Sequence, residues 1–179
     1  ARLPGVVPAG VTCPAVCNLL DLPPTFAECA DTAFPTPIDG RSLWPTLTGR
    51  HPADWPDETF SELVDPKHGR LLASRMIRSG QWKLWEFHDE DHLPPALFDV
   101  ASDPGELHDL ARDPAHGQVR DRLRARLHAD WDPEHALEVT RAELADHQVI
   151  QAWGRAVQPG HPDHLPAPPA EAEDNVELL

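Results

Sequence analysis

The sequence predicts an α+β fold, in which a small antiparallel sheet has helices packed against one face. Three observations support this prediction. Residues 59–100 are rich in strand-forming runs bounded by turn residues. Two of these runs join at Ser79-Gly80, a dipeptide typical of a hairpin turn. Residues 115–131 then place apolar side chains four positions apart, which indicates one stripe of a helix.

The first part of the chain predicts short elements. Val11 to Val16 form an apolar run that predicts a strand. In DLPPTFAECA, Asp21 can cap a helix whose first turn tolerates two prolines. Residues 39–49 predict a glycine-containing turn, an N-cap at Ser42, a short helical turn and a stop at Gly49.

The middle of the chain predicts the sheet. The runs are TFSELV, the two halves of SRMIRSGQWKLWEF, and PALFDV. In the run QWKLWEF, Trp82, Leu84 and Glu86 lie on one face of the predicted strand, and Lys83, Trp85 and Phe87 lie on the other. Because both faces carry apolar side chains, one or both must be covered.

Two helices follow the sheet. The stripe of the first consists of Val119, Leu123, Leu127 and Trp131, with arginines at 120, 122, 124 and 126 expected on a solvated face that pairs with acids. A second helix at about 133–157 carries Leu137, Leu144, Ile150, Trp153 and Val157 near helical spacing. The remaining tail is Pro-rich and acidic, so we expect it to be extended and ordered only where something holds it.

Composition limits the function. The 179 residues are 40% hydrophobic, enough for a domain with a real core. A formal net charge of −15 argues against nucleic acid or an anionic membrane as a partner. No stretch has the length and apolar composition of a membrane span, and the first residues lack the pattern of a signal peptide, so we expect neither in these residues. Since it begins abruptly at Ala1, we expect a piece of a longer chain.

The cysteines carry no metal or disulfide signature. Cys13, Cys17 and Cys29 are odd in number and lack the spacing of a zinc site, so we interpret them as buried or incidental thiols. They leave the compartment open and favour a reducing one, such as the cytoplasm.

Residues 95–114, PALFDVASDPGELHDLARDP, concentrate carboxylates between apolar residues. Their spacing does not match a calcium-binding EF-hand loop, and paired catalytic carboxylates would need a pocket that local sequence cannot show. Ser102-Asp103-Pro104-Gly105 is turn chemistry, in which Gly105 permits the bend. Glu106 and Asp109 then fall where acids favour a helix start. We therefore predict a structural turn that leads into a helix.

Other candidate sites are incomplete. His88 and His92 are four apart, but prolines follow and a strand precedes, so we predict a solvated hairpin loop rather than a metal site. The sequence has no nucleophile in a strained turn such as G-x-S-x-G, and no phosphate-binding glycine loop. We therefore expect no complete active site in this chain.

Several motifs occur in an order typical of one family. They are LLDLPPTFAECA, DGRSLWPTLTG, FSEL, RMIRSGQWKLWEF and ALFDVASDPGELHDLARDP, followed by an arginine-rich helix. Over residues 1–131 the chain resembles the C-terminal region of sulfatases of the alkaline-phosphatase-like superfamily. Residues 131–153 are similar to the helical extension of choline-sulfatase-like and phosphonate-monoester-hydrolase-like members.

The resemblance implies four parts. Residues 1–58 would end the large alkaline-phosphatase-like α/β domain, and residues 59–131 would form the C-terminal sheet-plus-helix subdomain. Residues 132–158 would be a helical extension, and residues 159–179 an acidic tail. Since choline-sulfatase-like members use C-terminal extensions to bridge subunits, we expect this tail to lie extended across a neighbouring subunit of a homo-oligomer or across the missing large domain. The alternative is a frayed terminus.

The resemblance also indicates what this chain lacks. The family's nucleophile is a formylglycine made from Cys or Ser in a C/S-x-P-x-R motif, which none of the cysteines fits. The metal-binding aspartates near the family's N-terminus have no match, so the calcium that the family implies would bind outside this chain. We expect the catalytic residues in a missing N-terminal catalytic region, which is the partner that the resemblance implies.

The segment LVDPKHGRL, residues 63–71, lies between two predicted strands. Lys67 and His68 are candidates to contact an anionic ester, and Gly69 lets the backbone turn. The alternative is an ordinary polar hairpin tip. We interpret Lys83, within a strand motif, as structural.

Two functions remain open. The first is the C-terminal portion of a sulfatase-like hydrolase, in which a hydrated formylglycine attacks the sulfur of an organic sulfate monoester; phosphonate or phosphodiester substrates are a close rival. In this role the chain would close the substrate pocket and support the fold. The second is a non-catalytic association module or subunit.

Overall fold

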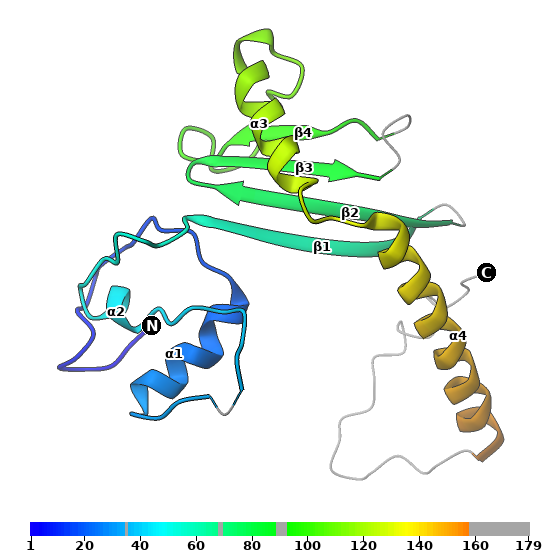
Figure 1. Ribbon diagram of the computed structural model, residues 1–179, viewed down its shortest axis with the longest axis horizontal. Helices are drawn as coiled ribbons and strands as arrows, with labels where there is room; N and C mark the ends of the chain where they lie inside the picture. Colours follow the sequence, from blue (N-terminus) through cyan, green and yellow to red (C-terminus); the bar gives the residue numbers. More distant parts are fainter. Residues whose placement is uncertain (35, 68–69, 89–92, 158–179) are drawn as a thin grey trace.

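The computed structural model describes residues 1–34, 36–67, 70–88 and 93–157. Its centre is a four-stranded antiparallel sheet in the order β1-β2-β3-β4 (Figure 1). The strands are β1 (Glu58–Lys67), β2 (Arg70–Ser79), β3 (Trp82–Phe87) and β4 (Ala96–Asp99). The helices are α1 (Leu22–Cys29), α2 (Trp44–Leu47), α3 (Gly117–Leu127) and α4 (Pro133–Val157), with short 3-10 helices at Leu19–Asp21 (η1) and Pro114–His116 (η2).

The predicted strands and hairpin are confirmed. Ser79 pairs with Trp82 across the β2–β3 turn, and Gly80 has a φ of +55°. This left-handed conformation is one that glycine adopts without a Cβ clash. The sheet and its helices confirm the predicted α+β class.

The core lies between α3 and one face of the sheet. Ile77, Leu84 and Leu97 are neighbours on β2, β3 and β4, and each is fully buried. Leu123 and Leu127 of α3 pack against them, which confirms the predicted helical stripe. The other two members of the stripe, Val119 and Trp131, are partly buried at the edge of this core, and Trp131 lies beyond the end of α3.

The predicted strand at Val11 to Val16 is wrong. These residues belong to no described strand, and Val16 bonds instead to a loop. Its N–H donates to Asp57 Oδ1 at 2.8 Å, and its carbonyl accepts from Trp55 Nε1 at 2.7 Å. An extended segment becomes part of a sheet only when a neighbouring strand takes up its backbone groups, and side chains take these two.

The helical predictions in the same region hold in part. Asp21 stands at the N-cap position of α1, which has prolines in its first turn, but its carboxylate does not cap that helix. It accepts instead from the backbone N–H groups of Asn18 and Arg41. Around α2, Ser42 Oγ accepts from Trp44 N, and the chain turns at Gly49 with a φ of +85°.

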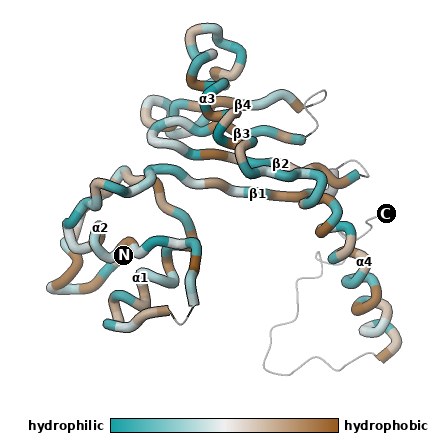
Figure 2. Tube along the Cα trace, viewed as in Figure 1, coloured by the Kyte–Doolittle hydropathy of each residue, from teal (hydrophilic) through white to brown (hydrophobic). Residues whose placement is uncertain are grey.

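Helix α4 has the predicted extent but leaves the sheet after its first turns (Figure 1). Leu137 is buried, whereas Ile150 and Trp153 are 62% and 59% exposed. Apolar stretches therefore recur away from the core, along α4 and along the N-terminal segment (Figure 2). No helix among the described residues is long and apolar enough to cross a membrane.

Candidate functional site

The predicted substrate-contacting residues belong to the β1–β2 hairpin. Lys67 is the last residue of β1 and its backbone pairs with Arg70, but its side chain and all of His68 lie outside the described residues. His92 and the tail from residue 158 also lie outside them. The role of Lys67 and His68 therefore stays a prediction.

The family-implied calcium finds no matching ligand set in the described part of the chain. Within residues 1–34, 36–67, 70–88 and 93–157, no group of three or more His, Cys, Asp or Glu side chains gathers to hold a metal ion. His88, considered above as a metal ligand, instead contacts Glu134 through its Nε2 atom at 2.9 Å. The described residues do not fit a calcium site.

The carboxylates of residues 99–113 hold the backbone of a turn. Asp99 accepts from Ala101 N, Asp103 from His108 N, and Asp109 from both Leu97 N and Ala111 N. Asp113 accepts from Ala115 N at the start of η2. The prediction of a structural turn at Ser102–Gly105 is confirmed. These carboxylates hold the segment that connects β4 to α3.

The pKa values of two of these aspartates reflect the same bonds. Burial raises the pKa of Asp99, but hydrogen bonds from Ala101 and Ser102 outweigh it and hold the pKa below its ordinary value. For Asp113, the hydrogen bonds from Ala115 and His116 lower the pKa. A carboxylate that accepts such bonds is stabilised in its charged form, as expected for a structural group.

The predicted helix start at Glu106 is wrong. Glu106 has a φ of +53°, outside the helical region, and the helical chain begins only at η2. Its carboxylate lies 2.7 and 2.9 Å from Lys83 Nζ. The ion pair draws the turn onto β3, which agrees with the predicted structural role of Lys83. Gly105 does not have the left-handed φ.

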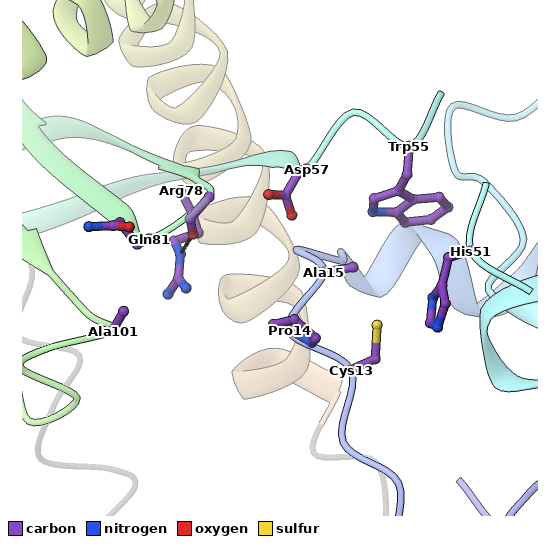
Figure 3. Close-up of a pocket in the computed structure, with 10 residues that line it drawn as sticks. Cys13, Pro14, Ala15, His51, Trp55, Asp57, Arg78, Gln81 and Ala101 are labelled. Carbon is purple, nitrogen blue, oxygen red and sulfur yellow. Dashed lines mark hydrogen bonds between the residues drawn. The ribbon is translucent and has the colours of Figure 1, made fainter. Parts of the chain in front are cut away.

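An open groove of about 700 Å³ lies where the N-terminal segment meets the β2–β3 turn. Its polar lining includes His51, Asp57, Arg78 and Gln81, with Cys13 beside them (Figure 3). Arg78 Nε donates to the Gly80 carbonyl at 2.7 Å. No hydrogen bond joins the Cys13 thiol to His51 in Figure 3. Sequence reasoning missed this groove because its walls are far apart in the chain.

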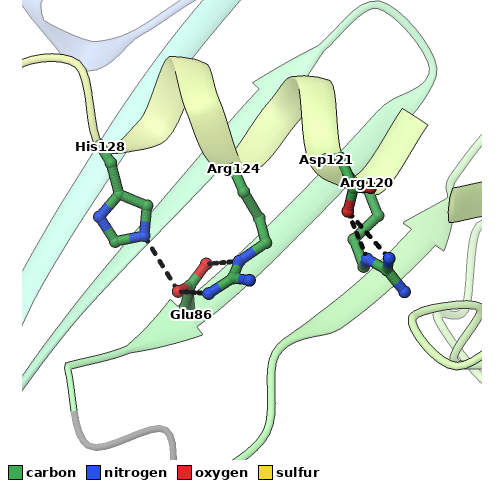
Figure 4. A network of polar contacts seen from close by, with 5 residues as sticks. All are labelled: Glu86, Arg120, Asp121, Arg124 and His128. Carbon is green, nitrogen blue, oxygen red and sulfur yellow. Dashed lines mark hydrogen bonds and ion pairs between the residues drawn. The ribbon is translucent and has the colours of Figure 1, made fainter. Parts of the chain in front are cut away.

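A second feature missed from the sequence is a buried charge network beneath α3 (Figure 4). Glu86 on β3 is fully buried and accepts from Arg124 Nε and Nη2 at 3.0 and 2.8 Å. His128 Nε2 lies 3.0 Å from the same carboxylate. Arg124 thus pairs with an acid, as predicted, but it points at the sheet, so the predicted solvated face is wrong for this arginine. Arg126 also pairs with an acid, Glu58, as predicted.

Arg75 ties the end of α3 to the sheet in a similar way. Its buried Nη1 donates to the Leu127 carbonyl at 2.6 Å and to Asp130 Oδ1 at 2.7 Å. Its guanidinium carbon also lies 4.4 Å from the centre of the Phe60 ring. The hydrogen bond from Arg75 lowers the pKa of Asp130. These polar groups therefore hold the helix in place, because a buried cation needs such partners.

Fold and site together define an α+β module in which the polar contacts of Lys83, Glu86 and Arg75 tie the sheet to its turn and to α3. The family model for the C-terminal part of N-sulphoglucosamine sulphohydrolase matches residues 1–132. The chain belongs to this family of sulfatase C-terminal regions.

Individual relatives agree with this assignment. Multifunctional alkaline phosphatase superfamily protein PehA of Trinickia caryophylli is 33% identical over 127 residues, which cover 65% of this chain and 24% of that protein. Arylsulfatase K of Mus musculus is 33% identical over 113 residues, or 60% of this chain and 20% of that protein. The crystal structure of a putative sulfatase from Bacteroides thetaiotaomicron superimposes with a TM-score of 0.54 and 31% identity, covering 60% of this chain and 23% of that one.

The chain thus spans a quarter or less of the length of these relatives. The matched part includes the sheet and α3, and it is the part that the sequence motifs predicted.

Proposed function

We propose that this chain is the C-terminal portion of a sulfatase-like hydrolase of organic sulfate monoesters, which closes one side of the substrate pocket and supports the fold. The observation that carries the proposal is the family match over residues 1–132, combined with relatives four to five times as long as the matched segment. The nucleophile and metal ligands of such an enzyme would come from the larger portion of the polypeptide, which would then be this chain's main partner.

Within this proposal, Lys67 and His68 at the β1–β2 hairpin are the residues that contact the anionic ester. A lysine ammonium and an imidazole can both donate hydrogen bonds to the oxygens of a sulfate group. The support is their position in the sequence, at the end of β1 and before the start of β2, two strands that pair with each other. They would act by binding the substrate.

The substrate class has one close rival. PehA carries the name of a multifunctional superfamily protein, and it is as similar to this chain as arylsulfatase K is. A phosphonate or phosphodiester substrate would use the same C-terminal portion, because the groups that select the ester lie elsewhere. The proposal therefore places the choice between sulfur and phosphorus outside this chain.

A second function, a non-catalytic association module, is favoured by one observation. Ile150 and Trp153 of α4 are exposed, and α4 leads into the acidic tail at residues 159–179, which we predicted to hold a homo-oligomer. Exposed apolar side chains of this size are typical of contact surfaces. Removing residues 159–179 and measuring the molar mass by light scattering tests this association; an unchanged mass contradicts it.

The coding sequence upstream of Ala1 tests the main proposal. We expect an in-frame segment with a C/S-x-P-x-R motif, and we expect the longer polypeptide to hydrolyse an aryl sulfate while the present chain does not. A phosphonate monoester assayed in parallel separates the rival. A start codon directly before Ala1, or turnover by the chain alone, would contradict the proposal.

Variants of the longer polypeptide test the two hairpin residues. Lys67→Ala and His68→Ala should raise KM for the sulfate ester more than they lower kcat, because they remove binding rather than chemistry. Arg112→Ala and His135→Ala are matched controls, since both residues are exposed and lie on other elements. Equal effects of all four variants would remove Lys67 and His68 from the site.

A further inference from the structure

The open groove of about 700 Å³ joins two parts of the chain that are distant in sequence (Figure 3). One end is formed by the β2–β3 turn with Arg78 and Gln81, and the other by the loop that carries His51 and Trp55. Residues 13–15 lie between these two ends. The volume of the groove is typical of pockets that bind small molecules, which measure roughly 300–1,000 Å³.

The two ends of the groove are tied together by Asp57. This residue has a φ of +47°, a left-handed conformation that a non-glycine residue keeps only where its surroundings hold it. Its Oδ1 accepts from Val16 N at 2.8 Å, and its carbonyl accepts from Gly80 N at 3.0 Å. The Val16 carbonyl in turn accepts from Trp55 Nε1 at 2.7 Å. The groove is therefore formed before any ligand arrives, which lowers the cost of binding.

Arg78 differs from the other arginines that are at least half-buried. Within the described residues there are three others, and each has its guanidinium on a carboxylate: Arg75 on Asp130, Arg120 on Asp121 and Arg124 on Glu86. Arg78 Nε donates to the Gly80 carbonyl. In the described part of the chain, no acceptor takes a hydrogen bond from its terminal nitrogens, which face the groove (Figure 3).

The terminal nitrogens of Arg78 define the polar end of the ligand. A guanidinium matches the two oxygens of a carboxylate or sulfate group with two parallel hydrogen bonds. Asp57 does not serve as this acceptor, since its Oδ1 is bonded to Val16 N and no ion pair joins it to Arg78 among the described residues. The carboxylate of Asp57 also repels a second anionic group near the middle of the groove. The ligand should therefore carry its negative charge at one end.

The rest of the lining defines the other end of the ligand. Pro14, Ala15 and Ala101 present carbon atoms to the groove. The Trp55 ring lines it too, and because the indole N–H is bonded to the Val16 carbonyl, this ring offers only its carbon surface. Such a lining favours an apolar ring over a chain of polar groups.

We propose that this groove binds an organic anion in which a ring carries one carboxylate or sulfate group. The anionic group lies on the terminal nitrogens of Arg78, and the ring lies against Pro14, Ala15 and Trp55. The site goes beyond the proposed function, which gives no residue of this groove a role. A ring-bearing sulfate ester that is a substrate and a carboxylate that is a separate ligand share this chemistry, so the experiment has an arm for each.

The test titrates the present chain with benzoate and follows the NMR signal of the Trp55 indole N–H, assigned by its loss in Trp55→Phe. We expect a saturable shift at millimolar benzoate that weakens as sodium chloride is added, because the salt screens the guanidinium. Benzamide is the matched probe, since it keeps the ring and the shape but has no charge. It should bind at least about tenfold more weakly, the scale of a hydrogen bond to a charged group.

Three variants separate the site from the rest of the protein. Arg78→Gln should weaken benzoate binding at least about tenfold. Arg122→Gln is the matched control, because Arg122 is exposed on α3 and does not line the groove. Since Arg78→Gln also removes the bond to Gly80, Ala101→Trp provides a second test: it fills the groove from an exposed position and leaves Arg78 in place. It should abolish binding without lowering the melting temperature.

Three outcomes would overturn the proposal. Equal affinities for benzoate and benzamide would show that Arg78 does not recognise the anionic group. Equal effects of Arg78→Gln and Arg122→Gln would place the ligand elsewhere. Binding to the present chain that disappears in the longer polypeptide would show that the rest of the protein covers the groove.

The longer polypeptide identifies the source of the ligand. If Arg78→Gln raises KM for phenyl sulfate, the ring-bearing anion is the substrate; if it weakens benzoate binding and leaves KM unchanged, the anion is a separate ligand. Both results retain the site. A longer polypeptide that binds benzoate at Arg78 but hydrolyses no sulfate ester would also retain the site, and it would refute the proposed function.

Discussion

The guanidinium of Arg124 donates two hydrogen bonds to the carboxylate of Glu86, which α3 covers completely. Arg124 is 33% exposed on its side chain, so the pair has one member in the core and one at its edge. A bidentate contact of this kind has fixed geometry. It sets the rotation of α3 about its own axis, so that Leu123 and Leu127 face the sheet.

Glu86→Gln should therefore be costly. The amide keeps the shape of the side chain but removes the charge that Arg124 and His128 contact. We expect a loss of about 3 kcal/mol in the free energy of unfolding, the scale of a broken buried ion pair. Urea denaturation measures it. Asp121→Asn, which breaks the exposed pair with Arg120, should cost less than about 0.5 kcal/mol; equal losses would contradict the structural role of Glu86.

Leu123→Ala tests the contact between α3 and the sheet. Leu123 is 2% exposed and packs in the core cluster. Its truncation should destabilise the chain by about 2–5 kcal/mol, the usual cost of removing a buried leucine side chain. Val139→Ala, on the exposed part of α4, is the control and should change stability little. A loss for Leu123→Ala below about 0.5 kcal/mol would place α3 elsewhere.

Gly40→Ala tests a close backbone approach in the N-terminal segment. A Cβ at this position would stand 1.8 Å from the carbonyl oxygen of Leu20, so the two segments would have to separate. The nearby bond from Arg41 N to Asp21 would weaken with them. We expect a loss of about 1–3 kcal/mol by urea denaturation, typical of overpacking.

Gly154→Ala is a control that should raise the free energy of unfolding, whereas Gly40→Ala should lower it. A Cβ at Gly154 meets nothing within 4 Å, and this residue lies within α4. Alanine should stabilise the helix by up to about 1 kcal/mol. A neutral Gly40→Ala would contradict the close approach.

The lowered pKa of Asp113 predicts a pH dependence of stability. Because the folded-state pKa lies below the ordinary value of 3.8, the stabilisation is present at neutral pH and is lost as the pH falls from about 4 through the folded-state pKa. Asp113→Asn removes this titration. The difference in melting temperature between the two proteins should be constant above pH 5 and shrink at lower pH. A melting-temperature difference that grows as the pH falls would contradict a lowered pKa of Asp113 in the folded protein.

Calcium should leave the melting temperature of this chain unchanged at millimolar concentration. A ligand that binds the native state raises its stability, and the described carboxylates do not gather into a metal site. Asp103 in particular accepts a hydrogen bond from His108 N at 2.8 Å. A calcium-dependent rise that disappears in Asp103→Asn would show that the turn binds the cation.

The sequence by itself determined the elements whose signals are local. The hairpin at Ser79-Gly80, the strands around it and the stripe of Leu123 and Leu127 were all predictable, because a turn residue and a side-chain period act within a few positions. The ordered motifs also indicated the family. The turn at Ser102–Gly105 followed from its own residues in the same way.

Tertiary structure decided everything that depends on a distant partner. Val16 is not in a strand because Asp57 and Trp55 take its backbone groups. The positive φ falls on Glu106 and not on Gly105, because Lys83 holds the Glu106 side chain in an ion pair. The position of Arg124 along its helix does not show whether its side chain lies in solvent or contacts Glu86, which is 38 positions away in the sequence. The physical reason is the same in each case: a hydrogen bond or a buried charge depends on what the fold brings beside it, and no local pattern records that neighbour.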